Sequence, residues 1–281
     1  MKTIGLIDYF LDEYHAHKAF DSVSEINAES GSDFKIVAAY AEKDSDSGMT
    51  TAEFCEKHGI ESKATIEELT SAVDYIMILS PDDNDKKEGY AIEAIKAGKP
   101  IFMDKTFTDT YASARRIFEA ADKAGVPLFS SSSLRYASEL APYKKDSTSV
   151  LVMGSGVTID KYAVHYLEIV FACMGTGVKS VRHEQRGEQE WAHLTYADGR
   201  KAPAVISMGD YLNFHVFLAD GTGKTRNLPI SSPIFKLQMA DVLRFFETKE
   251  VSFDRAETLE LMKTIDAIIE SKVNNGKCVE L

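Results

Sequence analysis

One short apolar segment does most to limit the folds open to this chain. Residues 75–79 read Tyr-Ile-Met-Ile-Leu, and none of these five side chains is charged. A strand that is apolar on both faces is typical of a parallel sheet that lies between two layers of helices. Similar strand-like runs stand at residues 3–7, 34–40, 101–103 and 126–130, and helical patterns separate them. The first half therefore predicts an α/β unit with a parallel sheet covered by helices on both faces.

The pattern changes after the serine run at residues 130–133. Strand-like runs then follow one another at residues 178–186, 191–196, 203–208 and 214–218, with turn signals at Asp198-Gly199 and Asp220-Gly221. Helical patterns cover residues 161–174, 233–247 and 255–273. We expect a Rossmann-type doubly wound domain over residues 1–131. We expect an α+β domain with a mostly antiparallel sheet over residues 132–281.

The composition limits the kinds of partner that the protein can bind. The formal net charge is −12, and an acidic surface repels both nucleic acid and anionic membranes. No apolar run approaches the ~18 residues that a membrane span needs. Three widely spaced cysteines without a C-x-x-C motif fit neither a disulfide framework nor a zinc site, and we expect a cytoplasmic protein without a metal. The two histidines of His15-Ala16-His17 would point about 200° apart on a helix, too far for one ion.

The turn after the first predicted strand, residues 8–13, has none of the glycines of a dinucleotide-binding turn. In G-x-G-x-x-G the glycines allow a tight turn and a close approach of the backbone to the pyrophosphate. The corresponding positions hold Asp8, Phe10 and Glu13. The Phe10 ring would fill the pyrophosphate space, and each carboxylate–phosphate pair at ~4 Å would cost about 4 kcal/mol before screening. Three interpretations stay open: the cofactor is held differently, no cofactor binds, or the turn has no function.

Lys105 lies where open α/β sheets bind ligands, just past the end of a strand. The segment at residues 98–106 reads Gly-Lys-Pro-Ile-Phe-Met-Asp-Lys-Thr. A lysine at the carboxyl end of a parallel strand can hydrogen-bond a substrate hydroxyl and lower its pKa. The alternative interpretation is a solvent-exposed lysine at a strand end.

The apolar helix predicted at residues 161–174 carries a polar stripe. Lys161, His165 and Glu168 are spaced i, i+4 and i+7, so they share one face. A polar stripe on an apolar helix needs partners or a cleft, and histidine is the usual general base near neutral pH. His165 is therefore either a general base or a core histidine paired with Glu168.

In their order and spacing these segments resemble the glucose–fructose oxidoreductase and inositol dehydrogenase family (Gfo/Idh/MocA). Residues 98–106 look like its G-K-P-V-x-x-E-K-P segment, with Asp104 in the place of the glutamate and Thr106 in the place of the proline. Residues 126–129 and 134–136 look like the next strand and its Arg-Tyr turn. Residues 161–175 resemble the family helix D-x-G-x-H-x-x-D, and the resemblance covers nearly the whole chain.

The resemblance implies hydride transfer between NAD or NADP and a sugar, inositol or related hydroxyl substrate. It implies that Lys105 polarises the reacting oxygen and that His165 accepts the hydroxyl proton. Glu42 falls where an acid would hold the adenosine ribose. The expected cofactor-binding residues are Asp8, Tyr9, Phe10, Glu42, Ser80, Pro81 and Asp104, and the expected substrate-binding residues are Arg135, Lys161 and Tyr162. A homodimer or homotetramer through the C-terminal sheet is also implied.

Three functions therefore stay open for the sequence. The first is an NAD(P)-dependent dehydrogenase or reductase acting on CH–OH groups. The second is a non-catalytic or repurposed relative that binds a small ligand without a dinucleotide, and the turn at residues 8–13 favours it. The third is cofactor-free lyase or hydrolase chemistry on a sugar with Lys105 and His165.

Overall fold

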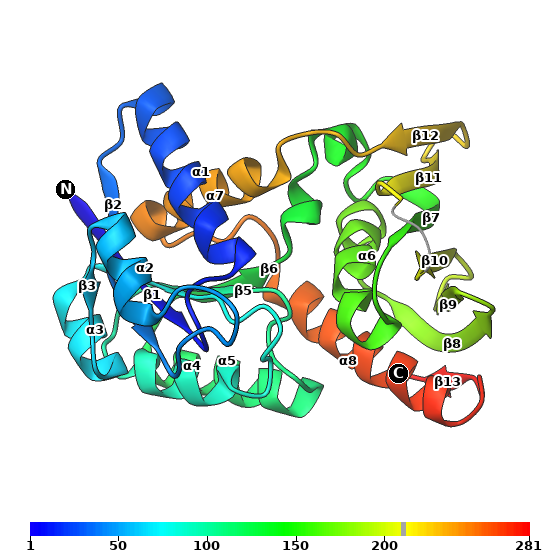
Figure 1. Cartoon of the computed structure of the whole chain (residues 1–281). Coiled ribbons are helices and arrows are strands. Elements are labelled where there is room, and N and C mark those ends of the chain that lie inside the picture. Colours follow the sequence, from blue (N-terminus) through cyan, green and yellow to red (C-terminus); the bar gives the residue numbers. More distant parts are fainter. Residues whose placement is uncertain (209–211) are drawn as a thin grey trace. The chain divides into compact units, whose positions relative to one another are not determined.

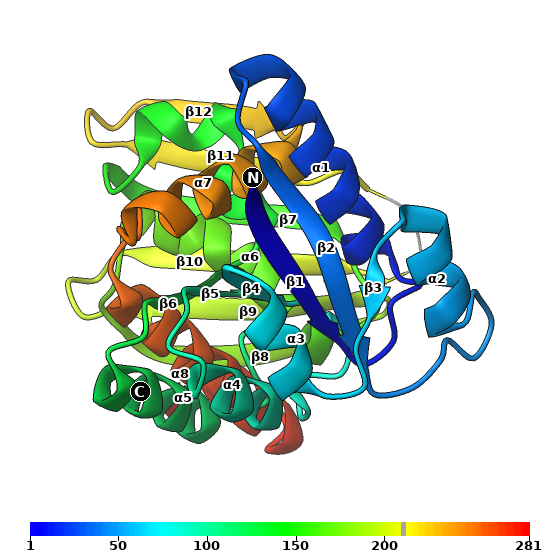
Figure 2. The ribbon, with the colours of Figure 1, turned by 90° about the vertical axis from the view of Figure 1, so that its left-hand side faces the viewer.

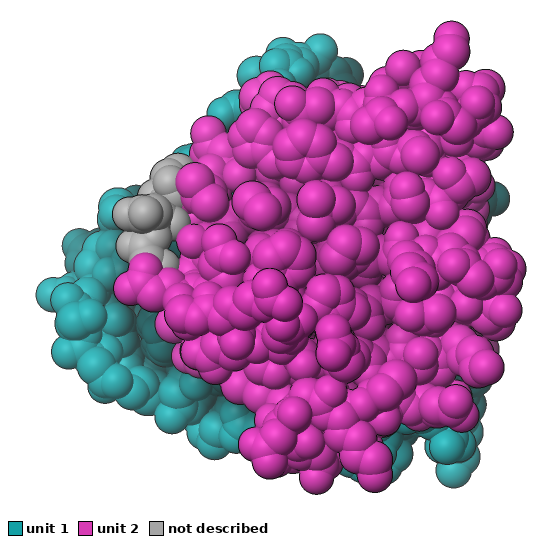
Figure 3. Space-filling model, turned by 90° about the vertical axis from the view of Figure 1, so that its right-hand side faces the viewer, with its two compact units in different colours: residues 1–131, 235–252 teal, residues 132–234, 253–281 magenta. Residues whose placement is uncertain are grey.

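The computed structural model describes residues 1–208 and 212–281, and the chain divides into two compact units. Unit 1 comprises Met1–Ser131 and Phe235–Ser252, and unit 2 comprises Ser132–Ile234 and Phe253–Leu281 (Figure 3). Each unit therefore consists of two segments of the chain.

Unit 1 contains a six-stranded parallel sheet in the order β3-β2-β1-β4-β5-β6 (Figures 1 and 2). The chain builds outward from β1 to β3 and then returns to the other side of β1, so β1 and β4 flank the point where the strand order reverses. This order confirms the Rossmann-type sheet, and ligands of such sheets bind at the carboxyl ends beside that point. The strands are β1 Lys2–Asp8, β2 Phe34–Ala41, β3 Glu61–Ser62, β4 Tyr75–Ile78, β5 Ile101–Asp104 and β6 Leu128–Ser131.

The helices of unit 1 begin and end at the residues that the local chemistry favours. Thr50 and Glu53 form a capping box at the start of α2, and Gly31, Gly59 and Gly125 end three helices with left-handed backbone. Thr110 is the N-cap of α5, and its hydroxyl accepts from Ser113 N. The helices are α1 Tyr14–Ser30, α2 Thr51–His58, α3 Ile66–Ala72, α4 Lys87–Ile95, α5 Tyr111–Ala124 and α7 Ile234–Thr248.

Helix α7 packs within unit 1, although it follows most of unit 2 in the sequence. The Phe245 ring lies 4.7 Å from that of Phe129 on β6, and the Phe246 ring stacks on Tyr75 of β4 at 4.8 Å. Gln238 also donates to the Ser131 carbonyl oxygen at 2.9 Å. The sequence-based division at residue 131 placed all later residues in one domain, and these contacts assign residues 235–252 to unit 1 instead.

Unit 2 contains a seven-stranded sheet in the order β12-β11-β7-β10-β9-β8-β13. All its pairs are antiparallel except β7 with β10, which confirms a mostly antiparallel sheet. The strands are β7 Ser147–Ser155, β8 Val178–Arg186, β9 Gln189–Tyr196, β10 Lys201–Ser207, β11 His215–Asp220, β12 Thr225–Pro229 and β13 Val279–Glu280. Its helices are α6 Ile159–Met174 and α8 Arg255–Val273, with 3₁₀ turns at Ser133–Tyr136 and Ser138–Tyr143.

The core of unit 2 forms between the sheet and these two helices. Helix α6 contacts β7 and β10, and α8 contacts β8. Along β9 the even-numbered side chains from Glu190 to Tyr196 are buried, and Trp191, His193 and Thr195 alternate with them on the other face. Across the described parts of both units, none of the helices combines the length and the apolar composition needed to cross a bilayer.

Candidate active site

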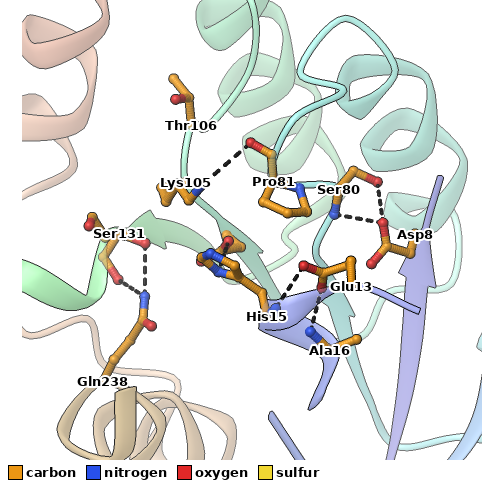
Figure 4. Close-up of polar contacts among 12 residues, drawn as sticks. Asp8, Glu13, His15, Ala16, Ser80, Pro81, Lys105, Thr106, Ser131 and Gln238 are labelled. Carbon is orange, nitrogen blue, oxygen red and sulfur yellow. Dashed lines mark hydrogen bonds and ion pairs between the residues drawn. The ribbon is translucent and has the colours of Figure 1, made fainter. Parts of the chain in front are cut away.

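Asp8 ends β1 inside unit 1, beside the point where the strand order reverses. Its side chain is 1% exposed, and Oδ1 accepts hydrogen bonds from Tyr9 N at 2.7 Å, Ser80 N at 3.0 Å and Ser80 Oγ at 3.1 Å (Figure 4). Oδ2 is buried and finds no hydrogen-bond partner among the described residues. Burial raises the pKa of Asp8 to about 7, although the three donors act in the opposite direction. The side chain thus links the ends of β1 and β4 and leaves one carboxyl oxygen unsatisfied.

Glu13 caps the N-terminus of α1 with its own carboxylate. Oε2 accepts from His15 N at 2.7 Å, and Oε1 accepts from Ala16 N. Burial and then the neighbouring Asp8 charge raise the pKa of Glu13 to about 8. The first free amides of the helix are therefore bound to an acidic group of the chain itself.

The β1–α1 turn in this conformation does not fit a dinucleotide pyrophosphate. In Rossmann-type folds the pyrophosphate lies against the N-terminal amides of this helix. Here the Glu13 carboxylate accepts hydrogen bonds from two of these amides, and the unsatisfied Oδ2 of Asp8 adds a second acidic group nearby. The rings of Tyr9 and Phe10 are half-buried and meet edge to face at 6.3 Å. Of the predicted cofactor residues, Asp8, Tyr9 and Phe10 thus precede a helix whose first amides already donate to Glu13.

Glu42 lies one residue past β2 and is exposed. Oε2 accepts from Tyr90 Oη at 2.6 Å, and Oε1 accepts from Lys86 Nζ at 3.1 Å. The hydrogen bond from Tyr90 and then that from Lys86 lower the pKa of Glu42. A charged carboxylate at this edge of the sheet can accept hydrogen bonds from ribose hydroxyls.

Asp104 and Lys105 stand at the carboxyl end of β5. Asp104 is 3% exposed, and its Oδ2 lies 2.8 Å from His15 Nδ1. Burial by itself would raise the pKa of Asp104, but His15 outweighs burial and brings the pKa to about 2. Lys105 is buried, and its Nζ donates to the Pro81 carbonyl oxygen at 3.4 Å, so Lys105, Pro81 and Ser80 lie along one edge (Figure 4).

Lys87 holds the loop that carries Lys105, and sequence reasoning missed it. Its side chain is fully buried, and Nζ donates to the carbonyl oxygens of Asp104 at 2.8 Å, Lys105 at 3.0 Å and Thr106 at 2.8 Å. Burial lowers the pKa of Lys87 to about 7. The peptide bond between Lys105 and Thr106 is cis. A lysine in the first turn of a helix ordinarily faces solvent, so nothing in the local pattern identified this one.

His165 lies on α6 in unit 2 and is half-buried. Its Nδ1 is 2.9 Å from Ser132 Oγ, and Ser132 N donates to Glu168 Oε1 at 2.8 Å. The Tyr162 ring lies 5.5 Å from the imidazole. Ser132 therefore orients His165. Glu168, its partner in one of the two interpretations, accepts from Ser132 N and Arg135 Nε. Lys161, expected on the same face, is exposed.

Arg135 is buried between two glutamates of unit 2. Nε donates to Glu168 Oε2, and Nη1 donates to Glu257 Oε2 at 2.8 Å. Lys145 adds a second cation 3.0 Å from Glu257 Oε1. The Phe253 ring covers the guanidinium at 4.0 Å. These contacts give Arg135 a place in the core, and its predicted contact with substrate stays a prediction.

The two histidines near the start of α1 bind different carboxylates. His15 pairs with Asp104, and His17 Nε2 lies 2.8 Å from Asp12 Oδ1. No group of three or more metal-binding side chains occurs among residues 1–208 and 212–281. The pairing of His15 with Asp104 was not predicted, because it depends on how α1 packs against the end of β5.

The strand order and the polar side chains at its carboxyl edge define a class of protein: a dinucleotide-type Rossmann unit joined to an α+β unit. Residues 11–132 match the Gfo/Idh/MocA family model, described as an oxidoreductase family with an NAD-binding Rossmann fold. The N-terminal domain of this chain is therefore similar, over residues 11–132, to the NAD-binding Rossmann domain of that family.

Solved structures share the fold over both units. A probable dehydrogenase from Thermotoga maritima matches at a TM-score of 0.79 and 12% identity, over 99% of this chain and 98% of that one. The WlbA dehydrogenase from Bordetella pertussis, in complex with NADH and UDP-GlcNAcA, matches at 0.76 and 16%, over 100% and 99%. A putative myo-inositol dehydrogenase from Sinorhizobium meliloti matches at 0.74 and 15%, over 100% and 99%. The comparison with curated proteins finds no match.

Proposed function

We propose that this protein is an NAD(P)-dependent oxidoreductase acting on a CH–OH group of a sugar, an inositol or a related small molecule. The observation that carries the proposal is the fixed position of Lys105. Lys87 anchors the backbone of residues 104–106 through three carbonyl oxygens, and Lys105 is thereby held at the ligand-binding edge of the parallel sheet. The match of residues 11–132 to an oxidoreductase family supports the same class of reaction.

The chain's own residues have distinct roles in this proposal. A nicotinamide, when bound, supplies or accepts the hydride. The Lys105 ammonium donates a hydrogen bond to the reacting oxygen and stabilises negative charge on it. His165, oriented by the Ser132 hydroxyl on Nδ1, exchanges the hydroxyl proton. Glu42 accepts hydrogen bonds from ribose hydroxyls, as an acid after the second strand does in this fold.

The test begins with titrations of NADH and NADPH, followed by thermal shift and by fluorescence transfer from Trp191. A panel of sugars, cyclitols and their acids is then screened for turnover with both cofactors. Lys105→Met should reduce kcat by about 100-fold or more, with cofactor affinity changed only a few-fold. Lys96→Met is the matched control, because Lys96 is an exposed lysine at the C-cap of α4 that forms an ion pair with Glu93.

Two results would refute the proposal. One is the absence of any response to either cofactor at millimolar concentration. The other is turnover that Lys105→Met leaves at the level of the Lys96→Met control.

One observation favours a second candidate function, a relative that binds a small ligand without a dinucleotide. The Glu13 carboxylate already satisfies the amides of His15 and Ala16 that a pyrophosphate would use. This function predicts binding of a small molecule in the absence of cofactor, and Lys105→Ala would leave that affinity unchanged. Calorimetry on the same ligand panel without cofactor distinguishes the two functions.

We also propose that the chain forms a homodimer or homotetramer through the seven-stranded sheet. The face turned away from α6 and α8 carries Trp191 and His193, whose rings stack, and Phe217, which is 37% exposed. Aromatic side chains on an open sheet face are typical of contacts between like subunits. Trp191→Arg should lower the mass measured by light scattering, whereas Val157→Arg, at an exposed site outside the sheet, should not. A monomeric wild-type protein at micromolar concentration would contradict this proposal.

A further inference from the structure

Four backbone amides at the N-terminus of α1 donate hydrogen bonds to nearby groups of the chain itself. Glu13 N donates to the Leu11 carbonyl oxygen at 2.8 Å, and His17 N donates to the Glu13 carbonyl oxygen at 3.3 Å. Between them, His15 N and Ala16 N donate to the two oxygens of the Glu13 side chain. Above its pKa of about 8, Glu13 therefore supplies the negative charge that favours a helix N-terminus.

A carboxylate in this place resembles a bound phosphate in its chemistry. Both groups present two oxygens and a negative charge to the same pair of backbone amides. The amides of His15 and Ala16 cannot serve Glu13 and a pyrophosphate at the same time. A glycine at position 13, which the dinucleotide motif uses, would carry no side chain to compete.

A second observation, independent of the helix, concerns Asp8. Its Oδ2 is buried and lacks a hydrogen-bond donor among the described residues. Once Asp8 has lost its proton, above about pH 7, this oxygen would meet an incoming phosphate as an acceptor facing an acceptor. Its Oδ1 already accepts hydrogen bonds from Tyr9 N, Ser80 N and Ser80 Oγ. The turn therefore opposes a diphosphate at two points, at the helix amides and at the end of β1.

We propose that Glu13 is the residue that sets the affinity of this site for a dinucleotide, by occupying the pyrophosphate position with its own carboxylate. The inference rests on the proposed function, because it concerns the cofactor of that reaction. A dinucleotide binds only when the Glu13 side chain leaves the amides of His15 and Ala16. A ligand without a diphosphate has no such competition.

The experiment compares ligands and variants in one matrix. NADH, ADP-ribose and adenosine are titrated by calorimetry at pH 9, above the pKa of Glu13, into the wild-type protein and into Glu13→Gln and Glu13→Ser. Gln keeps the shape and removes the charge, and Ser removes the charge while remaining a good neutral N-cap. Asp21→Asn is the control, because it removes one charge from an exposed site on the same helix, where Asp21 forms an ion pair with Lys18. Thermal unfolding of each variant verifies that it is folded.

The expected result is binding of NADH and ADP-ribose about tenfold tighter or more in both Glu13 variants, since a competing anion has been removed. Adenosine and the Asp21→Asn control should show no gain. If the wild type fails to bind NADH and the Glu13 variants bind it, the inference stands and the proposed cofactor dependence of this chain falls.

Other outcomes overturn the inference. Equal NADH affinity in wild type and both Glu13 variants shows that the carboxylate does not compete, and the proposed function then stands alone. If the Glu13 variants gain as much affinity for adenosine as for ADP-ribose, Glu13 does not compete with the diphosphate. Failure of every protein to bind NADH or ADP-ribose overturns the inference and the proposed function together.

Discussion

At the scale of single residues, Asp8 couples the protonation of the sheet edge to the stability of the fold. An aspartate in an unfolded chain loses its proton near pH 4. Burial raises the pKa of Asp8 to about 7 in the folded protein, so between these values only the folded chain holds the proton. The free energy of unfolding contributed by this residue therefore falls as the pH rises from about 4 to about 7.

Asp8→Asn should stabilise the protein above that window. The amide keeps an oxygen to accept from Tyr9 and Ser80 and has no charge to bury, so we expect a gain of about 1–3 kcal/mol near pH 8. The gain should shrink towards pH 4, where Asp8 is protonated in both states. Urea unfolding across this pH range measures it.

Asp74→Asn is the matched control for Asp8→Asn. Hydrogen bonds from the Thr3 backbone and hydroxyl lower the pKa of Asp74, so its contribution is present at neutral pH and is lost as the pH falls. The control should destabilise most at neutral pH, opposite in sign to Asp8→Asn. The same pH trend in both variants would contradict the assignment.

Lys87→Met tests the anchor of the Lys105 loop. The change removes the buried donor that three carbonyl oxygens share, and we expect a loss of about 2–4 kcal/mol in the free energy of unfolding. The adjacent Lys86→Met removes an exposed ion pair with Glu42 and a cation–π contact with Tyr9, and it should cost much less. Denaturant unfolding of the two variants compares them directly, and equal losses would mean that the loop does not depend on Lys87.

At the scale of elements, the buried Arg135 ties together three parts of unit 2. The 3₁₀ turn that carries it, helix α6 through Glu168 and helix α8 through Glu257 meet at one guanidinium. A single planar cation with several donors can serve both carboxylates, which lysine cannot do with the same geometry. The network therefore fixes how these elements pack around the helix that carries His165.

Arg135→Leu should destabilise the protein by about 3–5 kcal/mol, because it leaves two buried carboxylates with one partner fewer. Arg182→Leu removes an exposed ion pair with Glu184 in the same unit and should change stability by about 1 kcal/mol or less. Thermal and denaturant unfolding give the comparison. If Arg135 acts only on substrate, its replacement will raise KM or lower kcat and leave the unfolding midpoint where it was.

Local patterns allowed many elements to be predicted from the sequence. Strand β8 and helix α8 have the expected bounds, because their periodicity and caps lie within the segments themselves. Two features that depend on packing could not be predicted. The polar residue Lys87 is buried because it binds the carbonyls of a loop 17 residues or more away, and His15 pairs with Asp104 across the sheet edge. A linear pattern does not contain those distances.

At the scale of the whole molecule, unit 1 needs a helix that the chain supplies late. In helix α7, Phe245 packs on Phe129 and Phe246 packs on Tyr75. The order of the predicted elements along the sequence did not indicate which sheet this helix would cover. Because sequence periodicity reports only that a helix has an apolar face, it does not identify the surface that the face covers. The expected domain boundary therefore described the first segment of unit 1 and missed the second.

A polypeptide of residues 1–131 should not fold into a stable unit. Its sheet would expose the apolar surface that α7 covers, and we expect aggregation or a molten state with weak near-ultraviolet circular dichroism. A second polypeptide, with residues 235–252 joined to residue 131 by a Gly/Ser linker, should fold cooperatively. Equal unfolding behaviour of the two would show that α7 is dispensable.

The interleaving of the two units also bears on how such a chain can be inherited. Each unit is assembled from two segments, so the chain passes from one unit to the other at Ser131, at Ile234 and again at Ser252. A single recombination break point cannot exchange one unit and leave the other whole. Exchange of a whole unit between two chains would need break points at all three of these crossings.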